Sequence, residues 1–188
     1  MEYYKNNAKK YILKTKDVDM SCAYDFFLKY AKTKGKLLDI GFGSGRDMIY
    51  LNSIGFNCVG IDNIKTFVDE ALTKGLNAFC KDILECCNIY MEYDYIWASA
   101  SLLHIKKELL NKAFVYCGNM LKKDGIMYSS FKYGDFEGVI DDRYYIYLTE
   151  STINYYLENT DLKIIDYKIT DDNLNRDNKW INFIMKKV

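Results

Sequence analysis

Residues 36–51 read KLLDIGFGSGRDMIYL, and this stretch decides how the rest of the sequence is interpreted. Apolar residues on both sides of Asp39 predict a short buried strand. Gly41, Gly43 and Gly45 follow at alternate positions, and a helical pattern comes after them. This order places backbone N–H groups and a helix N-terminus at the carboxyl edge of a sheet, where ligands bind in open α/β folds. We therefore expect a nucleotide-like ligand at the glycines.

The rest of the chain alternates strand and helix patterns, as is typical of parallel βαβ units. Gly55 and Gly75 follow two helical patterns and mark their ends. The last two strands have no helix between them, so we expect an antiparallel hairpin at one edge of the sheet. The expected strands are residues 36–40, 57–61, 77–80, 93–99, 125–131, 162–170 and 180–187, and the expected helices are 18–33, 45–54, 63–74, 106–122 and 150–158.

The composition limits the class of protein and its partners. A length of 188 residues suits one domain, and 26 basic against 26 acidic residues disfavour a partner held by charge alone. Nine lysines against four acidic residues in the first 36 positions leave nucleic acid open. We expect a cytoplasmic protein, because no apolar run suggests a membrane span or a signal peptide. Six cysteines without a C-x-x-C pair, beside one histidine, predict reduced thiols and no metal site.

Two ligand classes compete for the glycine turn. A dinucleotide fingerprint, G-x-G-x-x-G/A, would place its last small residue at Arg46, where a long cation prevents close packing of helix on strand. Asp39 is also unfavourable beside a pyrophosphate but suits an amine-bearing ligand without phosphate. The full pattern D-x-G-x-G-x-G, from Asp39 to Gly45, resembles motif I of class I S-adenosylmethionine-dependent methyltransferases. A nicotinamide-dependent oxidoreductase is the alternative that Arg46 opposes.

The resemblance covers residues 36–131 closely and the last two strands by topology. It implies an α/β, Rossmann-like, doubly wound fold: a seven-stranded, mostly parallel sheet with a C-terminal antiparallel hairpin strand and an N-terminal helical lid. Small bacterial enzymes that carry LDxGxGxGRD, some tied to tellurite resistance, are the most similar members. We expect one methyltransferase domain over residues 1–188, divided into a lid at 1–34, a cofactor-binding core at 35–131, and a substrate loop with the C-terminal hairpin at 132–188.

Further residues stand where this family binds S-adenosylmethionine. Asp62 ends the second strand, where the resemblance implies that it accepts both ribose hydroxyls, with a helix N-cap as the alternative. Asp82 is expected at the adenine amino group, unless it is only a surface acid. Tyr11 and Arg46 are expected at the methionine carboxylate, and carbonyls at the end of the fourth strand at its amino group. The implied cofactor residues are Tyr11, Asp39, Gly41, Phe42, Gly43, Gly45, Arg46, Asp62, Asn63, Asp82, Ile83, Ala98 and Ser99.

His104 is the only histidine of the chain and follows the fourth expected strand. A histidine at this rim can remove a proton from an oxygen or nitrogen acceptor while the methyl group transfers. A thiol acceptor needs less help, because thiolates form readily near neutral pH. The alternative is a structural role, in which His104 caps or packs beneath the loop.

The segment after the fifth expected strand, SSFKYGDFEGVIDDRYYIYL, is longer than an ordinary connection. We expect it to supply acceptor contacts from Lys132, Tyr133 and Arg143. The two cations suit a carboxylate or a phosphate, although Arg143 can instead pair with Asp141 or Asp142.

The chain contains no proline. It therefore lacks the Asp/Asn-Pro-Pro-aromatic motif of enzymes that methylate base amines in DNA, and the Pro-Cys nucleophile of cytosine-C5 enzymes. Little chain is left for a separate substrate domain, so we expect a small-molecule acceptor, methylated at O, N or S by in-line displacement with S-adenosylhomocysteine as the product. A methyltransferase acting on tRNA or protein, and a non-catalytic module of the same fold, stay open.

Overall fold

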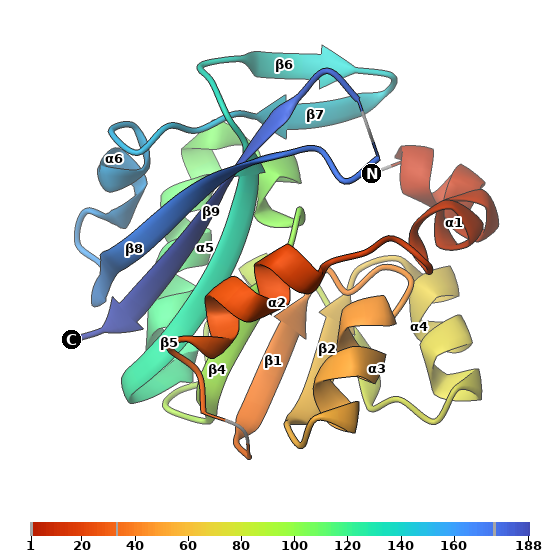
Figure 1. Ribbon diagram of the computed structural model, residues 1–188, viewed down its shortest axis with the longest axis horizontal. Coiled ribbons are helices and arrows are strands. Elements are labelled where there is room, and N and C mark those ends of the chain that lie inside the picture. Colours follow the sequence, from red (N-terminus) through yellow and green to blue (C-terminus); the bar gives the residue numbers. More distant parts are fainter. Residues whose placement is uncertain (1, 33, 175) are drawn as a thin grey trace.

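The computed structural model describes residues 2–32, 34–174 and 176–188. Its main sheet has seven strands in the order β3-β2-β1-β4-β5-β9-β8 (Figure 1). β9 runs antiparallel to both of its neighbours, and the other six strands are parallel to one another. This confirms the expected Rossmann-like, doubly wound topology with an antiparallel C-terminal strand. The strands are β1 (Lys36–Ile40), β2 (Asn57–Asp62), β3 (Ala78–Cys80), β4 (Tyr93–Ala98), β5 (Leu121–Lys132), β8 (Leu162–Asp171) and β9 (Lys179–Lys187).

Helices cover both faces of this sheet. Because side chains alternate along each strand, the central strands supply two separate apolar cores. Leu37, Trp97 and Tyr128 face one core, and the rings of Trp97 and Tyr128 stack with their centroids 4.0 Å apart. The first face carries α2 (Ser21–Leu28), α3 (Arg46–Ser53) and α4 (Lys65–Thr73), and the second carries α5 (Lys107–Met120) and α6 (Ile153–Leu157) (Figure 1).

The N-terminal helix α1 (Glu2–Thr15) lies beside α4 and the carboxyl ends of the strands (Figure 1). The rings of Tyr4 and Tyr11 on α1 pack against Phe67 of α4, with centroids 6.3 and 5.6 Å from it. This position agrees with the predicted N-terminal lid. In the described ranges, no helix has the length and apolar character needed to cross a membrane.

Three regions differ from the sequence prediction. The helix expected over residues 18–33 is the shorter α2, with α1 separate from it, and β5 starts at Leu121, directly after α5. The expected substrate loop contains a hairpin made of β6 (Glu137–Ile140) and β7 (Arg143–Ile146). Its two-residue turn is Asp141-Asp142, with φ angles of 49° and 59° that aspartate tolerates better than most residues.

Candidate active site

Two cavities open at the carboxyl end of the sheet. The first, which we call the glycine-loop cleft, has a volume of about 370 Å³ and lies over the turn after β1. The second, which we call the basic pocket, has a volume of about 290 Å³ and lies between α1, the ends of β4 and β5, and the C-terminal hairpin. Tyr4, Tyr11, Ala100 and His104 line both cavities. A ligand in one cavity would therefore lie next to a ligand in the other.

The glycine loop approaches its surroundings too closely for side chains. Gly41, Gly43 and Gly45 have φ angles of 69°, 55° and 76°, in the left-handed region that favours glycine. A Cβ atom on Gly41 would lie 2.6 Å from the Cβ atom of Ser101, and one on Gly43 would lie 3.2 Å from Cε1 of Tyr11. The loop backbone is therefore the floor of the cleft, and Tyr11 of the lid packs onto it.

Asp62 lines the glycine-loop cleft and is held by two backbone groups. Its Oδ2 accepts a hydrogen bond from the Gly43 N–H at 3.1 Å, and its Oδ1 accepts one from the Ile64 N–H at 2.9 Å. Burial raises the pKa of this carboxyl group to about 6, although the two backbone hydrogen bonds act in the opposite direction. Asp62 therefore forms the turn before α4, and it also presents carboxylate oxygens to the cleft.

The far end of the cleft holds a second carboxylate. Asp82 Oδ1 accepts from the Leu84 N–H at 2.9 Å, and its Oδ2 accepts from the Asn63 side-chain amide at 2.8 Å. Ile83 is buried beside it and lines the cleft. The polar groups thus stand at the edges of an apolar slot whose walls are Ile40, Ile61, Ile64, Phe67, Leu84, Leu102, Ile105 and Leu109.

Four predicted cofactor residues do not line either cavity: Asp39, Phe42, Gly45 and Ala98. Phe42 packs into the core, where its ring contacts the backbone of Gly60. Asp39 is only 2 % exposed, and its Oδ2 has no hydrogen-bond partner among the described residues. Burial, and then the negative charge of Asp47, raise its pKa well above the usual range. These residues support the glycine loop from behind rather than forming its surface.

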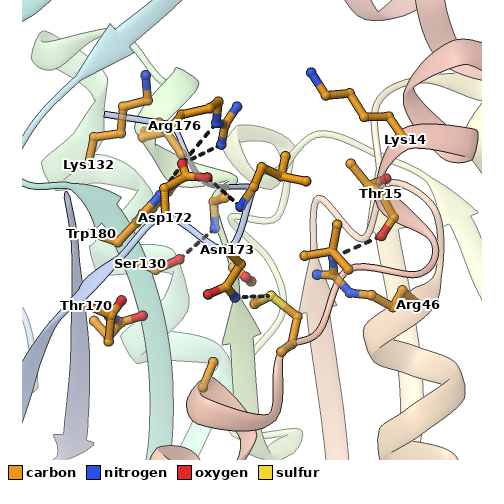
Figure 2. A pocket seen from close by; sticks show the side chains of 18 of the residues that line it. Lys14, Thr15, Arg46, Ser130, Lys132, Thr170, Asp172, Asn173, Arg176 and Trp180 are labelled. Atoms are coloured by element: carbon orange, nitrogen blue, oxygen red, sulfur yellow. Dashed lines mark hydrogen bonds and ion pairs between the residues drawn. The ribbon is translucent and has the colours of Figure 1, made fainter. Parts of the chain in front are cut away.

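Arg46 lies on the basic-pocket side instead of in the glycine-loop cleft. Its Nε donates to Asp47 Oδ1 at 2.7 Å. Its Nη1 donates to the Thr15 carbonyl at 3.1 Å, as Figure 2 shows. Asp47 also accepts from Tyr24 and Trp97, at 2.6 and 2.9 Å. Sequence reasoning missed this buried acid, which holds Arg46 against the end of α1. Ser99, another predicted cofactor residue, also lines the basic pocket.

His104 stands in the wall between the two cavities, with both ring nitrogens bonded. Its Nδ1 lies 2.7 Å from the Tyr144 carbonyl, which can only accept, so Nδ1 carries the proton. Nε2 of the neutral ring therefore accepts the hydroxyl proton of Tyr4 at 2.8 Å. Burial lowers the pKa of His104 to about 4; the Tyr144 hydrogen bond raises it, and Arg143 and Lys132 lower it further. Sequence reasoning singled out Tyr11 of the lid and missed Tyr4.

The three predicted acceptor residues separate in the structure. Lys132 and Arg143 both line the basic pocket, whereas Tyr133 lies outside the linings of both cavities. The Tyr133 backbone is committed to the sheet, because its N–H donates to the Lys179 carbonyl at 2.9 Å. Its position therefore does not support an acceptor contact.

Comparison with known proteins places this arrangement in a family. Residues 37–125, which include the glycine turn, match a family model described as a methyltransferase domain. Together with the fold, this match supports a class I S-adenosylmethionine-dependent methyltransferase. The cofactor of this methyltransferase is S-adenosylmethionine, as the glycine-turn motif predicted. A search of curated proteins finds no match, and nothing in the comparisons bears on the resemblance to tellurite-resistance enzymes.

Several solved structures share the fold of this methyltransferase. The 1,6-didemethyltoxoflavin-N1-methyltransferase of Burkholderia thailandensis, crystallised with 1,6-didemethyltoxoflavin and S-adenosylhomocysteine, matches with a TM-score of 0.81 and 16% identity over 99% of this chain and 84% of that one. A methyltransferase from Methanosarcina mazei has a TM-score of 0.77 and 16% identity over 88% and 98% of the two chains. One from Archaeoglobus fulgidus has a TM-score of 0.75 and 17% identity over 98% and 100%.

The residues of the glycine-loop cleft fit S-adenosylmethionine. The ligand has hydroxyl and amino donors but no phosphate, and the cleft offers buried carboxylates on a glycine floor. The Oγ of Ser101 is buried beside Gly41 without a partner in the described residues, so it can bond to a ligand. The apolar slot between Asp62 and Asp82 has room for an adenine ring.

Proposed function

We propose that this methyltransferase transfers a methyl group to a small molecule bound in the basic pocket. The observation that carries the proposal is the shared wall of Tyr4, Tyr11, Ala100 and His104, which separates a cleft suited to the cofactor from a second cavity. The fold neighbour from Burkholderia thailandensis is crystallised with a small molecule, 1,6-didemethyltoxoflavin, which is consistent with a small-molecule acceptor.

In the proposed complex, the cleft residues bind and orient the cofactor. Asp62 accepts the ribose hydroxyls, and Asp82 with Asn63 contacts the edge of the adenine ring, which lies against Ile83. The bound cofactor supplies a methyl group made electrophilic by the sulfonium. The Gly41–Gly45 backbone and Tyr11 exclude water and align the methyl group with the basic pocket, so that an acceptor atom can approach in line with the departing sulfur.

His104 is proposed as the base for an oxygen or nitrogen acceptor. Its Nε2 is already an acceptor because the Tyr144 carbonyl fixes the proton on Nδ1. The hydroxyl of Tyr4 occupies the place on Nε2 that an acceptor O–H or N–H would take. Either the acceptor displaces this hydroxyl, or Tyr4 relays the proton to His104. A thiolate acceptor would use neither route.

The first experiment is isothermal titration with S-adenosylhomocysteine and, separately, with NADH. We expect micromolar binding of S-adenosylhomocysteine and no binding of NADH; the reverse result would overturn the proposal. The second incubates the enzyme and methyl-tritiated S-adenosylmethionine with three extracts from one cell lysate: small molecules, RNA and protein. Label is expected in the small-molecule extract. Label confined to RNA or protein would assign a macromolecular acceptor, and no transfer despite cofactor binding would favour a non-catalytic module.

A further inference from the structure

Lys132 is a buried cation whose described partners are all uncharged. It ends β5, is 9% exposed, and its Nζ donates to the Tyr147 hydroxyl at 3.0 Å. The ammonium also lies 4.6 Å and 5.1 Å from the ring centroids of Tyr145 and Tyr147. Figure 2 shows Asp172 of the same pocket bonded to Arg176 and Trp180 instead. An ammonium removed from water without a counter-charge is unfavourable, so Lys132 is poised for an anion.

Arg143 is a second cation of the pocket with unused donors. Its Nη2 lies 3.8 Å from Asp141, beyond hydrogen-bond distance, and the side chain of Asp141 is 78% exposed. The Nε of Arg143 is buried and has no partner among the described residues. The guanidinium lies over the rings of Tyr3 and Tyr145, 4.4 and 5.3 Å from their centroids. These contacts fix the plane of the guanidinium, and the Tyr4 hydroxyl lies within its reach. No described carboxylate lies within hydrogen-bond distance of it, so a ligand carboxylate or phosphate can bind there.

The two cations belong to one subsite beside His104. Both lie over the ring of Tyr145, and that ring lies 4.8 Å from the imidazole of His104, between centroids. The other cations of the pocket differ. Arg46 is paired with Asp47 and Arg176 with Asp172, while Lys10, Lys14 and Lys168 are exposed. Only Lys132 and Arg143 are therefore cations of this pocket that are shielded from water and lack a close carboxylate in the described residues.

We propose that the methyl acceptor is a small anionic molecule whose carboxylate or phosphate is bound by Lys132 and Arg143. This inference rests on the proposed function, because it treats the basic pocket as the acceptor site. The aromatic walls formed by Tyr3, Phe26, Tyr145 and Trp180 favour a flat or ring-containing body for the rest of the molecule. The anionic group then anchors the acceptor, and its nucleophilic atom reaches toward His104.

The test measures binding of simple probes to protein saturated with S-adenosylhomocysteine. Benzoate, phenyl phosphate and the neutral isostere benzamide are titrated by ligand-observed NMR. We expect at least one of the two anions to bind at least tenfold more tightly than benzamide. The preferred anion distinguishes a carboxylate from a phosphate acceptor.

Variants then test the subsite. We expect Lys132→Met and Arg143→Met each to weaken binding of the preferred anion at least tenfold. Lys163→Met, which removes an exposed charge on β8, is expected to change this affinity less than twofold. Lys132→Gln and Arg143→Lys provide milder variants, and thermal melting shows that each protein is folded.

The outcomes separate the two proposals. If S-adenosylhomocysteine binds but benzamide binds as well as the anions, or if the variants do not weaken the anions, the anionic subsite is wrong and the proposed function stands. If S-adenosylhomocysteine does not bind, the same probes are titrated against the free protein. Anions that then bind through Lys132 and Arg143 support the subsite, and the methyltransferase reaction is wrong.

Discussion

The glycine-loop cleft and the basic pocket meet at one wall but carry opposite chemistry. In the cleft, the buried charge is a carboxylate, Asp62, held by two backbone N–H groups. In the pocket, the shielded charges that lack a close carboxylate among the described residues are Lys132 and Arg143, held against tyrosine rings. Each cavity is therefore matched to a different ligand. The cleft suits a ligand rich in hydrogen-bond donors, and the pocket suits one rich in hydrogen-bond acceptors.

The largest expected effect comes from removing the carboxylate of the cleft. Asp62→Ala should weaken binding of S-adenosylhomocysteine by about 3–6 kcal/mol, because the two proposed hydrogen bonds from the ribose hydroxyls to the carboxylate are lost. Calorimetry checks this, and Asp69→Ala is the matched control, since Asp69 lies outside the cleft and pairs with Lys65 on the surface of α4. Because burial raises the pKa of Asp62 to about 6, binding to the wild type should also weaken as the pH falls below that value. Equal affinities of the two variants would show that Asp62 does not bind the ribose.

The next effect is the titration of the single histidine, which NMR resolves without overlap. We expect His104 to titrate at about pH 4, far below the ordinary 6.5, and its pKa to rise in Arg143→Met as a neighbouring positive charge is removed. Because the pKa of His104 is lower in the folded protein than in the unfolded chain, the unfolded chain binds the proton first as the pH falls. His104 thus stabilises the fold fully above pH 6.5, and about 3 kcal/mol of this is lost as the pH falls to 4.

Asp62 acts in the opposite direction over an overlapping range, because its raised pKa favours the folded state while the carboxyl is protonated. Its contribution is full below 3.8, the ordinary pKa of aspartate, and is lost as the pH rises through about 6. Denaturant unfolding of wild type and His104→Gln, compared from pH 4 to 7, separates the histidine contribution. A parallel pH dependence of the two proteins would contradict it.

A smaller effect is expected where the lid packs onto the cleft floor. Gly43→Ala should cost about 1–2 kcal/mol of stability for the left-handed φ and also weaken S-adenosylhomocysteine, since the new methyl group would press on Tyr11. Gly75→Ala is the control: its φ is 73°, but no atom lies within 4 Å of the added methyl group. Loss of stability in both variants, with loss of affinity only in Gly43→Ala, is the expected pattern. Equal affinities would indicate that Tyr11 moves freely.

The smallest expected effect concerns the hydrogen bond between Tyr4 and His104 in the wall between the two cavities. Tyr4→Phe removes the hydroxyl donor of His104 Nε2 and should cost about 1 kcal/mol, measured by chemical denaturation. It should also raise the pKa of His104, because a hydrogen bond to the neutral imidazole is lost. Tyr3→Phe, on the same helix, keeps the ring beneath Arg143 and should change neither quantity. An unchanged His104 titration in Tyr4→Phe would argue against a proton relay through Tyr4.

Local patterns predicted the cleft well, because its parts are close in sequence to the strands that carry them. Asp62 ends β2 and Asp82 follows β3, and parallel strands bring their carboxyl ends to one edge. The hairpin β6–β7 also had a local signal, the Asp141-Asp142 pair between alternating residues, but it was interpreted as a loop. Phe42 and Ala98 do not line either cavity, because a motif does not determine whether a side chain points to the ligand or to the core.

The basic pocket depended on contacts that no local pattern contains. The hydrogen bond between Tyr4 and His104 joins residues 100 positions apart. The ring of Tyr145 on β7 contacts both Arg143 and Lys132, which ends β5, only when the hairpin is in place. Asp47, the partner of Arg46, is adjacent to it in sequence. The burial of Asp47 depends on Tyr24 and Trp97, which are distant in sequence and donate hydrogen bonds to it.

The placement of α1 has a consequence for the order of assembly. This helix precedes the central strands in the sequence, but its partners come late: His104 lies 100 positions after Tyr4, and Asn173, 154 positions after Asp19, bonds to the Asp19 carbonyl just after α1. Contacts of such long sequence separation form slowly, because a large loop must close before they stabilise anything. We therefore expect the central strands to fold before α1 docks. A chain that stops before Asn173 would then lack a contact that holds the lid beside both cavities.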